Sequence, residues 1–268
     1  MIRVEGMILV PAGNFLMGSK ESDIIIAIEN MRIECKKYND MRPEKPLKEK
    51  SQNEIPQRLI YLDAFYIDIY PVTNAEYRIF LDKTGYPRRP ATIDHPVLGI
   101  SDHPVVSVSY RDALEYAKWA GKDLPTEAQW EKAARGENGK IYAWGNKQPD
   151  DNGIIMANYS PGNNRKICGY EFTCPIDAFP CNISTYGAAG MTGNVFEWTS
   201  DWYHDDWYKA GNENVNPQGP SYGIEKVVKG GSYLNLGFCL RCADRHHYDP
   251  LLTSEIVGFR CVRNIVKE

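Results

Sequence analysis

The amino-acid sequence predicts one mixed α/β domain over residues 1–268, with more loop than regular structure. Marked helix starts and a segment of alternating apolar residues occur in its first half. Beyond residue 136 no long helical period appears, and Gly, Asn, Pro and aromatic residues dominate. Because such residues favour turns, the second half is expected to consist of loops and short strands. Hydrophobic residues make up 43% of the chain, which excludes wholesale disorder.

The N-terminal part is predicted to contain strands and one helix. Residues 7–19 predict a short strand, then a turn over residues 11–13 that leads into residues 15–19, and residues 24–35 predict a helix. That helix lies in an insertion or exposed excursion over about residues 20–52, whose end is rich in Lys, Glu and Pro. Residues 58–70 alternate apolar and polar side chains, which is typical of a half-buried strand.

Three further helices have marked ends. Residues 73–76 and 126–129 are capping boxes, in which the first hydroxyl accepts a backbone N–H and the last side chain accepts the N–H of the first residue. Residues 109–112 begin another helix, with an apolar face of alanine and tyrosine. Gly121 and Gly136 follow two of these helices and are expected to end them.

Composition restricts the partners and the location. A net charge of −4 and a pI near 5.8 give no electrostatic basis for binding nucleic acid or an anionic membrane, so the expected partner is a protein or a small molecule. The N-terminus lacks the apolar core of a signal peptide, and no stretch approaches the roughly 18 apolar residues that span a bilayer. Seven cysteines without a tandem C-x-x-C framework favour free thiols, and these features together favour the cytoplasm.

Ordered motifs in the sequence point to a family. Residues 230–235 read Gly-Gly-Ser-Tyr-Leu-Asn, and residues 258–261 read Gly-Phe-Arg-Cys. Further motifs lie, in order, at residues 62–68, 72–77, 103–106, 119–131, 142–146 and 193–202. This ordered set resembles the formylglycine-generating enzyme (sulfatase-modifying factor) family and covers nearly everything except residues 20–52. The resemblance implies the loop-rich C-type-lectin-like α/β (α+β) fold of that family.

The resemblance also implies a copper site that this chain lacks in part. The enzymes of the family bind copper through a cysteine pair just after the Gly-Gly-Ser turn and oxidise a substrate cysteine. Here Asn235 occupies the first ligand position in a shorter loop, and an amide oxygen is a poor copper(I) ligand. Cys239 and Cys242 form a C-x-x-C pair, but in a strand they would point to opposite faces. Copper is therefore not expected.

Two other cysteine positions have implied roles. Cys242 and Cys261 resemble structural cysteines of the family, whose usual disulfide partners fall at Ala134 and Ala117 in this sequence. Both thiols are therefore expected to be free and buried.

Calcium is the cofactor that the sequence leaves open. The resemblance implies one site formed by Asn158, Tyr159 and Tyr170, whose carboxylate position is Cys168, and a second formed by Gly193, Val195 and Glu197, whose side-chain ligand position is Gly190. Calcium prefers six or more oxygen ligands, so each site has lost one side-chain ligand. Glu197 is expected either to bind an ion weakly or to accept hydrogen bonds from nearby backbone N–H groups.

The composition of the C-terminal segment is skewed. Residues 231–254 include no Lys, Glu, Gln, Met or Trp, the five types that codons ending in a pyrimidine cannot encode. In some ligand-binding relatives of the family that the chain resembles, diversity-generating retroelements randomise this region. A core strand would also lack Lys and Glu, so both origins stay open.

Two functions remain as hypotheses. The favoured one is a ligand-binding or accessory module that recognises its partner through the loop surface of about residues 232–254, in fixed or diversified form. The residues expected on that surface are Asn235, Phe238, Cys239, Arg245, His246, His247, Tyr248 and Leu252. The alternative is an oxygen-dependent oxidoreductase that acts on a cysteine or thiol, with Ser232, Cys239 and Cys242 as candidate catalytic residues.

Overall fold

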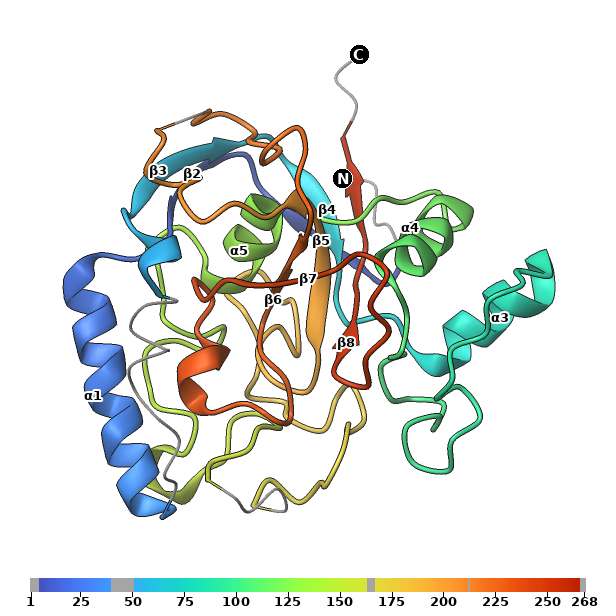
Figure 1. Ribbon diagram of the computed structural model, residues 1–268, viewed down its shortest axis with the longest axis horizontal. Coiled ribbons are helices and arrows are strands. Elements are labelled where there is room, and N and C mark those ends of the chain that lie inside the picture. Colours follow the sequence, from blue (N-terminus) through green and yellow to red (C-terminus); the bar gives the residue numbers. More distant parts are fainter. Residues whose placement is uncertain (1–4, 40–50, 163–166, 212, 266–268) are drawn as a thin grey trace.

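The structure, a computed structural model, describes residues 5–39, 51–162, 167–211 and 213–265. Three small sheets joined by long loops contain the described strands (Figure 1). In sheet order they are β1 (Met7–Val10), β4 (Phe65–Asp68) and β9 (Val262–Asn264); β2 (Gly13–Met17) and β3 (Arg58–Leu62); and β7 (His246–Tyr248), β6 (Lys226–Lys229), β5 (Phe196–Trp202) and β8 (Val257–Gly258). All pairs are antiparallel except β5 with β8. The loop-rich α+β architecture predicted from the sequence is confirmed.

The described helices agree well with the capping signals. They are α1 (Glu21–Lys37), α3 (Asn74–Thr84), α4 (Tyr110–Trp119) and α5 (Glu127–Arg135), with short 3-10 turns η1 (Ser51–Glu54), η2 (Asp151–Gly153) and η3 (Gly237–Leu240). Thr73, Ser109 and Thr126 cap α3, α4 and α5 through complete capping boxes. Gly136 caps the end of α5, and Gly121 directly follows the C-cap of α4. Each of these predictions came from a pattern within a single helical turn.

The predicted strand over residues 58–70 is instead two strands. It is interrupted between Leu62 and Phe65, so β3 pairs with β2 and β4 pairs with β1 and β9. The two halves therefore belong to different sheets. The alternation of side chains correctly predicted a strand in each half. It gives no indication that the two halves pair with strands of different sheets.

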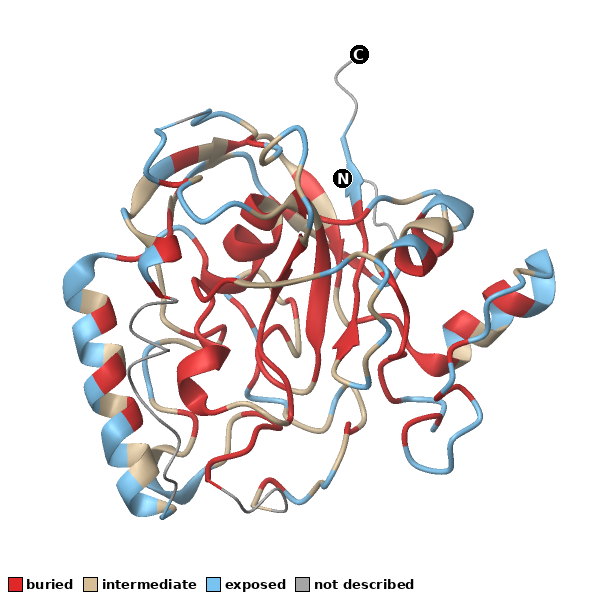
Figure 2. Ribbon diagram, viewed as in Figure 1, coloured by how far each residue is buried: buried red, intermediate tan, exposed pale blue. Residues whose placement is uncertain are grey.

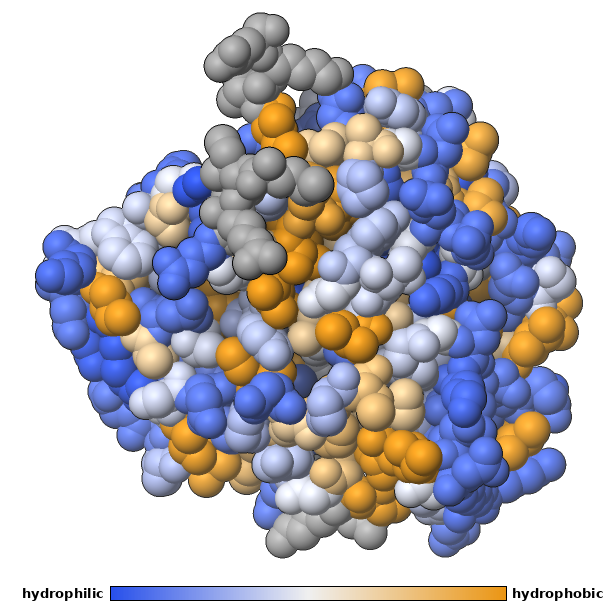
Figure 3. Space-filling model, turned by 180° about the vertical axis from the view of Figure 1, so that it is seen from behind, coloured by the Kyte–Doolittle hydropathy of each residue, from blue (hydrophilic) through white to orange (hydrophobic). Residues whose placement is uncertain are grey.

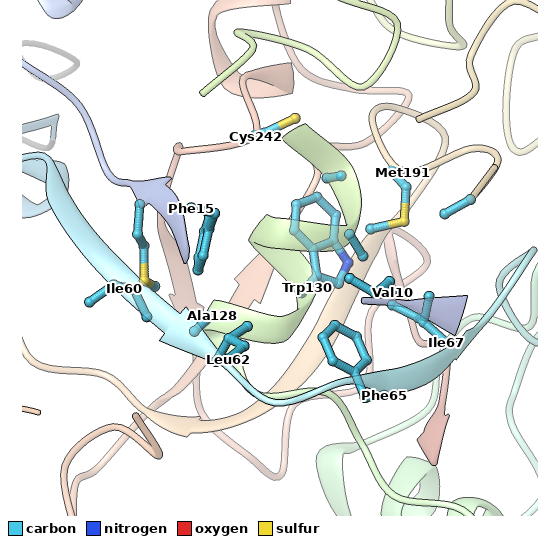
Figure 4. Close-up of a cluster of buried hydrophobic side chains, with 14 of the residues drawn as sticks. Val10, Phe15, Ile60, Leu62, Phe65, Ile67, Ala128, Trp130, Met191 and Cys242 are labelled. Atoms are coloured by element: carbon cyan, nitrogen blue, oxygen red, sulfur yellow. The ribbon is translucent and has the colours of Figure 1, made fainter. Parts of the chain in front are cut away.

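One of the two main core clusters among the described residues surrounds Trp130 of α5 (Figure 4). Trp130 is fully buried, and its indole N–H donates to the Glu197 carboxylate at 2.7 Å. The charged residues of α5 are buried as well, which requires partners. Glu131 accepts from Arg135 at 2.8 Å and from Lys229 of β6 at 3.1 Å. The helix is thus an internal element held by ion pairs as well as by apolar packing.

Helix α1 packs against the body of the protein by one face (Figure 2). Its buried residues Ile24, Ile28 and Met31 contact η3, and residues 51–54 are buried except for Gln52. The described part of the 20–52 segment is therefore packed by one face of α1, so the expectation of an exposed excursion is wrong for that face, and the alternative of an insertion stays a prediction. Residues 40–50 of that segment lie outside the described residues.

A buried carboxyl predicts a pH dependence of stability. Burial, and then repulsion from Glu127, raises the pKa of Asp201 to about 7. The folded state therefore keeps this proton while the unfolded chain loses it near pH 4. Since the unfolded state then binds fewer protons, the free energy of unfolding is expected to fall between about pH 4 and pH 7. Denaturant titrations at pH 5 and pH 8 should show this loss, and Asp201→Asn should reduce it; an unchanged loss in the variant would contradict the assignment to Asp201.

No helix among the described residues is long and apolar enough to cross a membrane. On the face shown in Figure 3, hydrophilic residues dominate and apolar residues occur in groups between them.

Candidate functional site

The two glycines after β6 form a tight turn that leads the chain into the interior. Gly230 and Gly231 have φ values of +98° and +72°, a region that favours glycine. A Cβ on Gly230 would lie 2.7 Å from the carbonyl oxygen of Met191, and one on Gly231 would lie 2.8 Å from that of Cys239. Ser232, which follows, is completely buried. The turn therefore requires both glycines.

Asn235 closes this turn. Its Oδ1 accepts the backbone N–H of Ser232 at 2.9 Å and the Ser232 hydroxyl at 2.6 Å. Its own carbonyl accepts the N–H of Ser160 at 2.8 Å. The amide oxygen at the implied first copper position is thus engaged in a local hydrogen-bonded turn, and the same turn engages Ser232.

Removing that amide should destabilise the fold. Asn235→Ala leaves two donors of the buried Ser232 without an acceptor, so the free energy of unfolding is expected to fall by about 1–3 kcal/mol. Asn235→Asp keeps an acceptor oxygen, so its free energy of unfolding is expected to fall by less than that of Asn235→Ala. Chemical denaturation of both variants measures this, and equal losses would show that the acceptor is not what matters.

Helix α1 covers the part of the loop that was expected to be exposed. Phe238 and Cys239 are only 4% and 6% exposed, because the apolar face of α1 lies over them. The Glu34 carboxylate of α1 accepts the N–H of Gly237 at 3.2 Å. Arg241 is bound by both oxygens of Glu54, at 2.9 and 2.7 Å. The prediction that Phe238 and Cys239 belong to an exposed surface is therefore wrong.

Arg245 is likewise an interior residue. Its guanidinium donates to both oxygens of Glu127, at 2.7 and 3.1 Å, and to the carbonyl of Asn53. It is 4% exposed, so it cannot contact a partner as predicted. Its role is to join the C-terminal segment to α5 and η1.

Cys239 and Cys242 do not form a pair. Cys239 belongs to the cluster under α1, whereas Cys242 packs in the core cluster of Trp130 and Ala134. Burial raises the pKa of the Cys242 thiol to about 12, so it is inert at neutral pH. Residues 237–240 form a 3-10 helix and not the strand considered from the sequence, yet the two sulfurs still face different clusters. Cys261 packs in the same cluster as Ala117. Cys242 and Cys261 are both free and buried, as predicted.

The structure brings Cys239 and His246 together with a residue that the sequence did not single out. One ligand-type atom from each of Cys239, Asp244 and His246 lies within 4.8 Å of the other two. Nε2 of His246 lies 2.9 Å from Oδ2 of Asp244. Burial alone lowers the pKa of this imidazole, but Asp244, with a contribution from Cys239, more than offsets it and raises the pKa of His246 to about 10. This group is called the Cys239 cluster below.

The exposed part of the predicted surface lies at β7 and the loop beside it. His247 stacks on Tyr203 at 3.8 Å between ring centroids, and its Nδ1 lies 2.7 Å from the Glu225 carboxylate. Tyr222 and Ile224 lie outside the predicted range of residues 232–254, in the segment that leads into β6, and are 85% and 87% exposed. These five residues are called the β7 surface. Tyr248 and Leu252 are partly exposed near its end, and Asn235 is partly exposed elsewhere on the loop.

A hollow adjoins the β7 surface. It has a volume of about 680 Å³, and His204, Trp207 and Tyr222 are among its lining residues. Aromatic side chains of this kind are typical of surfaces that bind a partner. The sequence showed their abundance but could not place them together.

The first implied calcium site fits in part. The carbonyl of Tyr159 accepts the thiol of Cys168 at 3.1 Å, so one implied ligand is engaged. Oδ1 of Asn158 is buried and has no hydrogen-bond partner among the residues that the structure describes, while its amide nitrogen donates to the carbonyl of Phe172 at 2.8 Å. An unsatisfied buried oxygen suits a cation, but with Cys168 in place of a carboxylate the set has no negative ligand. Tyr170, the third member, could add its carbonyl.

The second implied calcium site does not fit. Both oxygens of Glu197 are bound by Arg260, at 2.7 and 2.8 Å, and one also accepts from the Trp130 indole. The carbonyl of Gly193 accepts the N–H of Val195 at 2.9 Å. Glu197 therefore neutralises a buried arginine, and the prediction that it accepts hydrogen bonds from backbone N–H groups is wrong. Its weak binding of an ion stays a prediction.

Burial gives a physical reason for the skewed composition. Residues 236–245 are all buried, so Lys and Glu would be disfavoured throughout. The segment is exposed mainly after residue 246.

Comparison with known proteins gives a family and a fold. A family model described as "Sulfatase-modifying factor enzyme 1-like domain" matches residues 1–265. The formylglycine-generating enzyme of Bos taurus is 34% identical, over 95% of this chain and 74% of that protein. The structure of PvdO from Pseudomonas aeruginosa matches with a TM-score of 0.72 at 24% identity, over 97% of this chain and 94% of that one. Treponema denticola variable protein 1 matches with a TM-score of 0.66 at 18% identity, over 96% and 94%. At these identities the two structural likenesses show the fold alone.

Proposed function

From the premise that this chain belongs to the sulfatase-modifying factor family, as the formylglycine-generating enzymes do, we propose that it is a binding or accessory module and not a copper oxidase. The observation that supports this most is the turn closed by Asn235. Its amide oxygen accepts two hydrogen bonds from Ser232, where the resemblance implies a copper-binding thiol. Cys239 and Cys242 face separate clusters and do not supply a two-thiolate site in its place. Copper(I) favours soft thiolate ligands, and this arrangement offers no pair of them.

The alternative, an oxygen-dependent oxidoreductase, is favoured by one observation. The 34% identity to a formylglycine-generating enzyme extends over 95% of the chain. A direct assay separates the two functions. The purified protein is incubated with copper, oxygen, a reductant and a Cys-x-Pro-x-Arg peptide, and the peptide is weighed by mass spectrometry. An unchanged cysteine mass is expected, and conversion to formylglycine would overturn the proposed module.

We propose the β7 surface as the contact face and a protein as its partner. Tyr222 and Ile224 are large side chains that remain almost fully exposed beside a hollow and an edge strand. Exposed aromatic and aliphatic groups that cluster in this way are typical of protein interfaces. His247 and Glu225 are in hydrogen-bond contact at the same place and supply polar contacts.

A photo-crosslinking amino acid at position 222 tests this face, with one at the exposed Ile33 of α1 as the matched control. A partner is expected to be captured from position 222 and not from 33. Its purified form should lose at least about tenfold in affinity for the Tyr222→Ser/Ile224→Ser variant, since central aromatic contacts dominate interfaces. It should bind an Ile25→Ser/Ile33→Ser variant normally. Equal capture at both positions, or equal affinity for both variants, would contradict the assignment.

A further inference from the structure

We infer that the Cys239 cluster is a zinc site built from Cys239, Asp244 and His246. The first support is convergence. A thiol sulfur, a carboxylate oxygen and an imidazole nitrogen lie within 4.8 Å of one another, and Nε2 of His246 is 2.9 Å from Oδ2 of Asp244. A tetrahedral zinc ion with bonds of about 2.0–2.3 Å places its ligand atoms roughly 3.3–3.7 Å apart, so small side-chain movements suffice to form the site.

The backbone holds the three ligands together by separate means. Cys239 lies in η3, and the N–H of Asp244 donates to the carbonyl of Arg241 at 3.0 Å in the turn that follows. His246 begins β7, where it pairs with Val228 of β6. The ring of His246 also packs on Phe196, at 4.8 Å between centroids. The ligands are therefore fixed on a 3-10 helix, a turn and a strand, and not on one flexible loop.

The geometry suits an ion better than a Cys-His-Asp relay. In a relay the thiol and the carboxylate contact opposite nitrogens of the imidazole, so the ring separates them. Here the sulfur and a carboxylate oxygen lie within 4.8 Å of each other, which is too close for the imidazole ring to separate them. Three ligands that meet at one point are what a metal centre requires.

The ligand types select zinc. Sulfur, nitrogen and oxygen together form the borderline set that zinc accepts, whereas calcium and magnesium require oxygen ligands. Copper(I) prefers two soft ligands and would find one thiol here. On binding, zinc would release to solvent the thiol proton of Cys239 and the imidazole proton that faces Asp244, and its fourth position would be left for water or a further ligand.

The surroundings also favour a bound cation. Arg241 lies 3.4 Å from Asp244, but both oxygens of Glu54 already neutralise it. Ile24, Ile28 and Met31 of α1 cover Cys239 and limit the access of water to the sulfur. Electrostatic attraction is stronger in such a poorly hydrated site. A metal here would also tie η3, and the helix packed on it, to β7.

The test uses the full-length reduced protein and zinc or cobalt alone. After dialysis against a weak chelator, one zinc per chain is expected by elemental analysis. Cobalt(II) should give a thiolate-to-metal charge-transfer band together with the intense visible bands of tetrahedral coordination. Cys239→Ser and His246→Gln should each weaken zinc binding at least about tenfold, the loss that removing even an outer-shell partner produces.

Cys242→Ser is the matched control, because it removes a buried thiol three positions away that faces another cluster. It should keep both the zinc and the thiolate band. Circular dichroism of each variant separates loss of a ligand from loss of the fold. The cobalt spectrum of the wild type is a test that requires no variant to fold. No retained zinc in the wild type, a cobalt spectrum without the thiolate band, or equal binding by folded Cys239→Ser would each overturn the site.

Discussion

Replacing Arg260 by alanine is expected to lower the free energy of unfolding by about 3–5 kcal/mol, the cost of leaving a buried carboxylate unpaired. Arg260 is completely buried and binds both oxygens of Glu197. It also donates to the carbonyls of Ile69 and Ala189, at 3.0 and 2.9 Å. One side chain thus joins β5 to two loops, and its loss leaves several buried acceptors without a donor.

Equilibrium denaturation with urea measures this loss, and two variants interpret it. Arg89→Ala breaks an ion pair whose side chains are 53% and 73% exposed, and should cost less than about 1 kcal/mol. Arg260→Lys keeps the charge but not the bidentate contact with Glu197. Its loss in the free energy of unfolding should be intermediate between the losses of the two alanine variants. If Arg260→Ala cost no more than Arg89→Ala, the pair with Glu197 would not be a main support of the fold.

Gly231→Ala should have the second large effect, and it should also disturb the Cys239 cluster. Its φ of +72° costs an alanine about 1–2 kcal/mol. The new Cβ would lie 2.8 Å from the carbonyl oxygen of Cys239 and 3.0 Å from a methyl group of Leu240, and overpacking of this kind costs about 1–3 kcal/mol more. Since η3 must shift to relieve the contact, the melting temperature and zinc affinity should both fall.

Gly85→Ala separates the two causes. Gly85 caps α3 with a φ of +63°, and a Cβ there would meet nothing within 4 Å. It should therefore show only the conformational cost and leave zinc binding unchanged. Equal destabilisation by the two substitutions would mean that the turn yields easily and that η3 is not packed against it.

Local patterns were sufficient to predict much of the fold. A capping box lies within one helical turn, so Thr73, Ser109 and Thr126 could be identified from their neighbours in sequence. The order of motifs likewise indicated the family, because each motif is a contiguous stretch. The free, buried state of Cys242 and Cys261 followed from the alanines that the resemblance aligns with their partners.

Contacts between distant segments could not be predicted in the same way. Glu34 and Gly237 are 203 positions apart, and the apolar face of α1 does not indicate which element it covers. Arg245 and Glu127 are 118 positions apart, so their pairing could not be predicted either, and a charged residue that was expected on the surface is buried. The three residues of the Cys239 cluster lie within eight positions of one another in the sequence. Their side chains meet because β7 pairs with β6, which the sequence does not indicate. Sequence spacing alone therefore listed Cys239 and His246 as surface residues and overlooked Asp244.

The alanines beside two buried cysteines have a consequence for how this protein responds to its surroundings. Cys242 packs in one cluster with Ala134, and Cys261 in another with Ala117, so van der Waals contact stands where the family resemblance implies covalent cross-links. Cohesion at these two places is therefore independent of the redox potential. The same packed state should persist in a strongly reducing milieu and in an oxidising one.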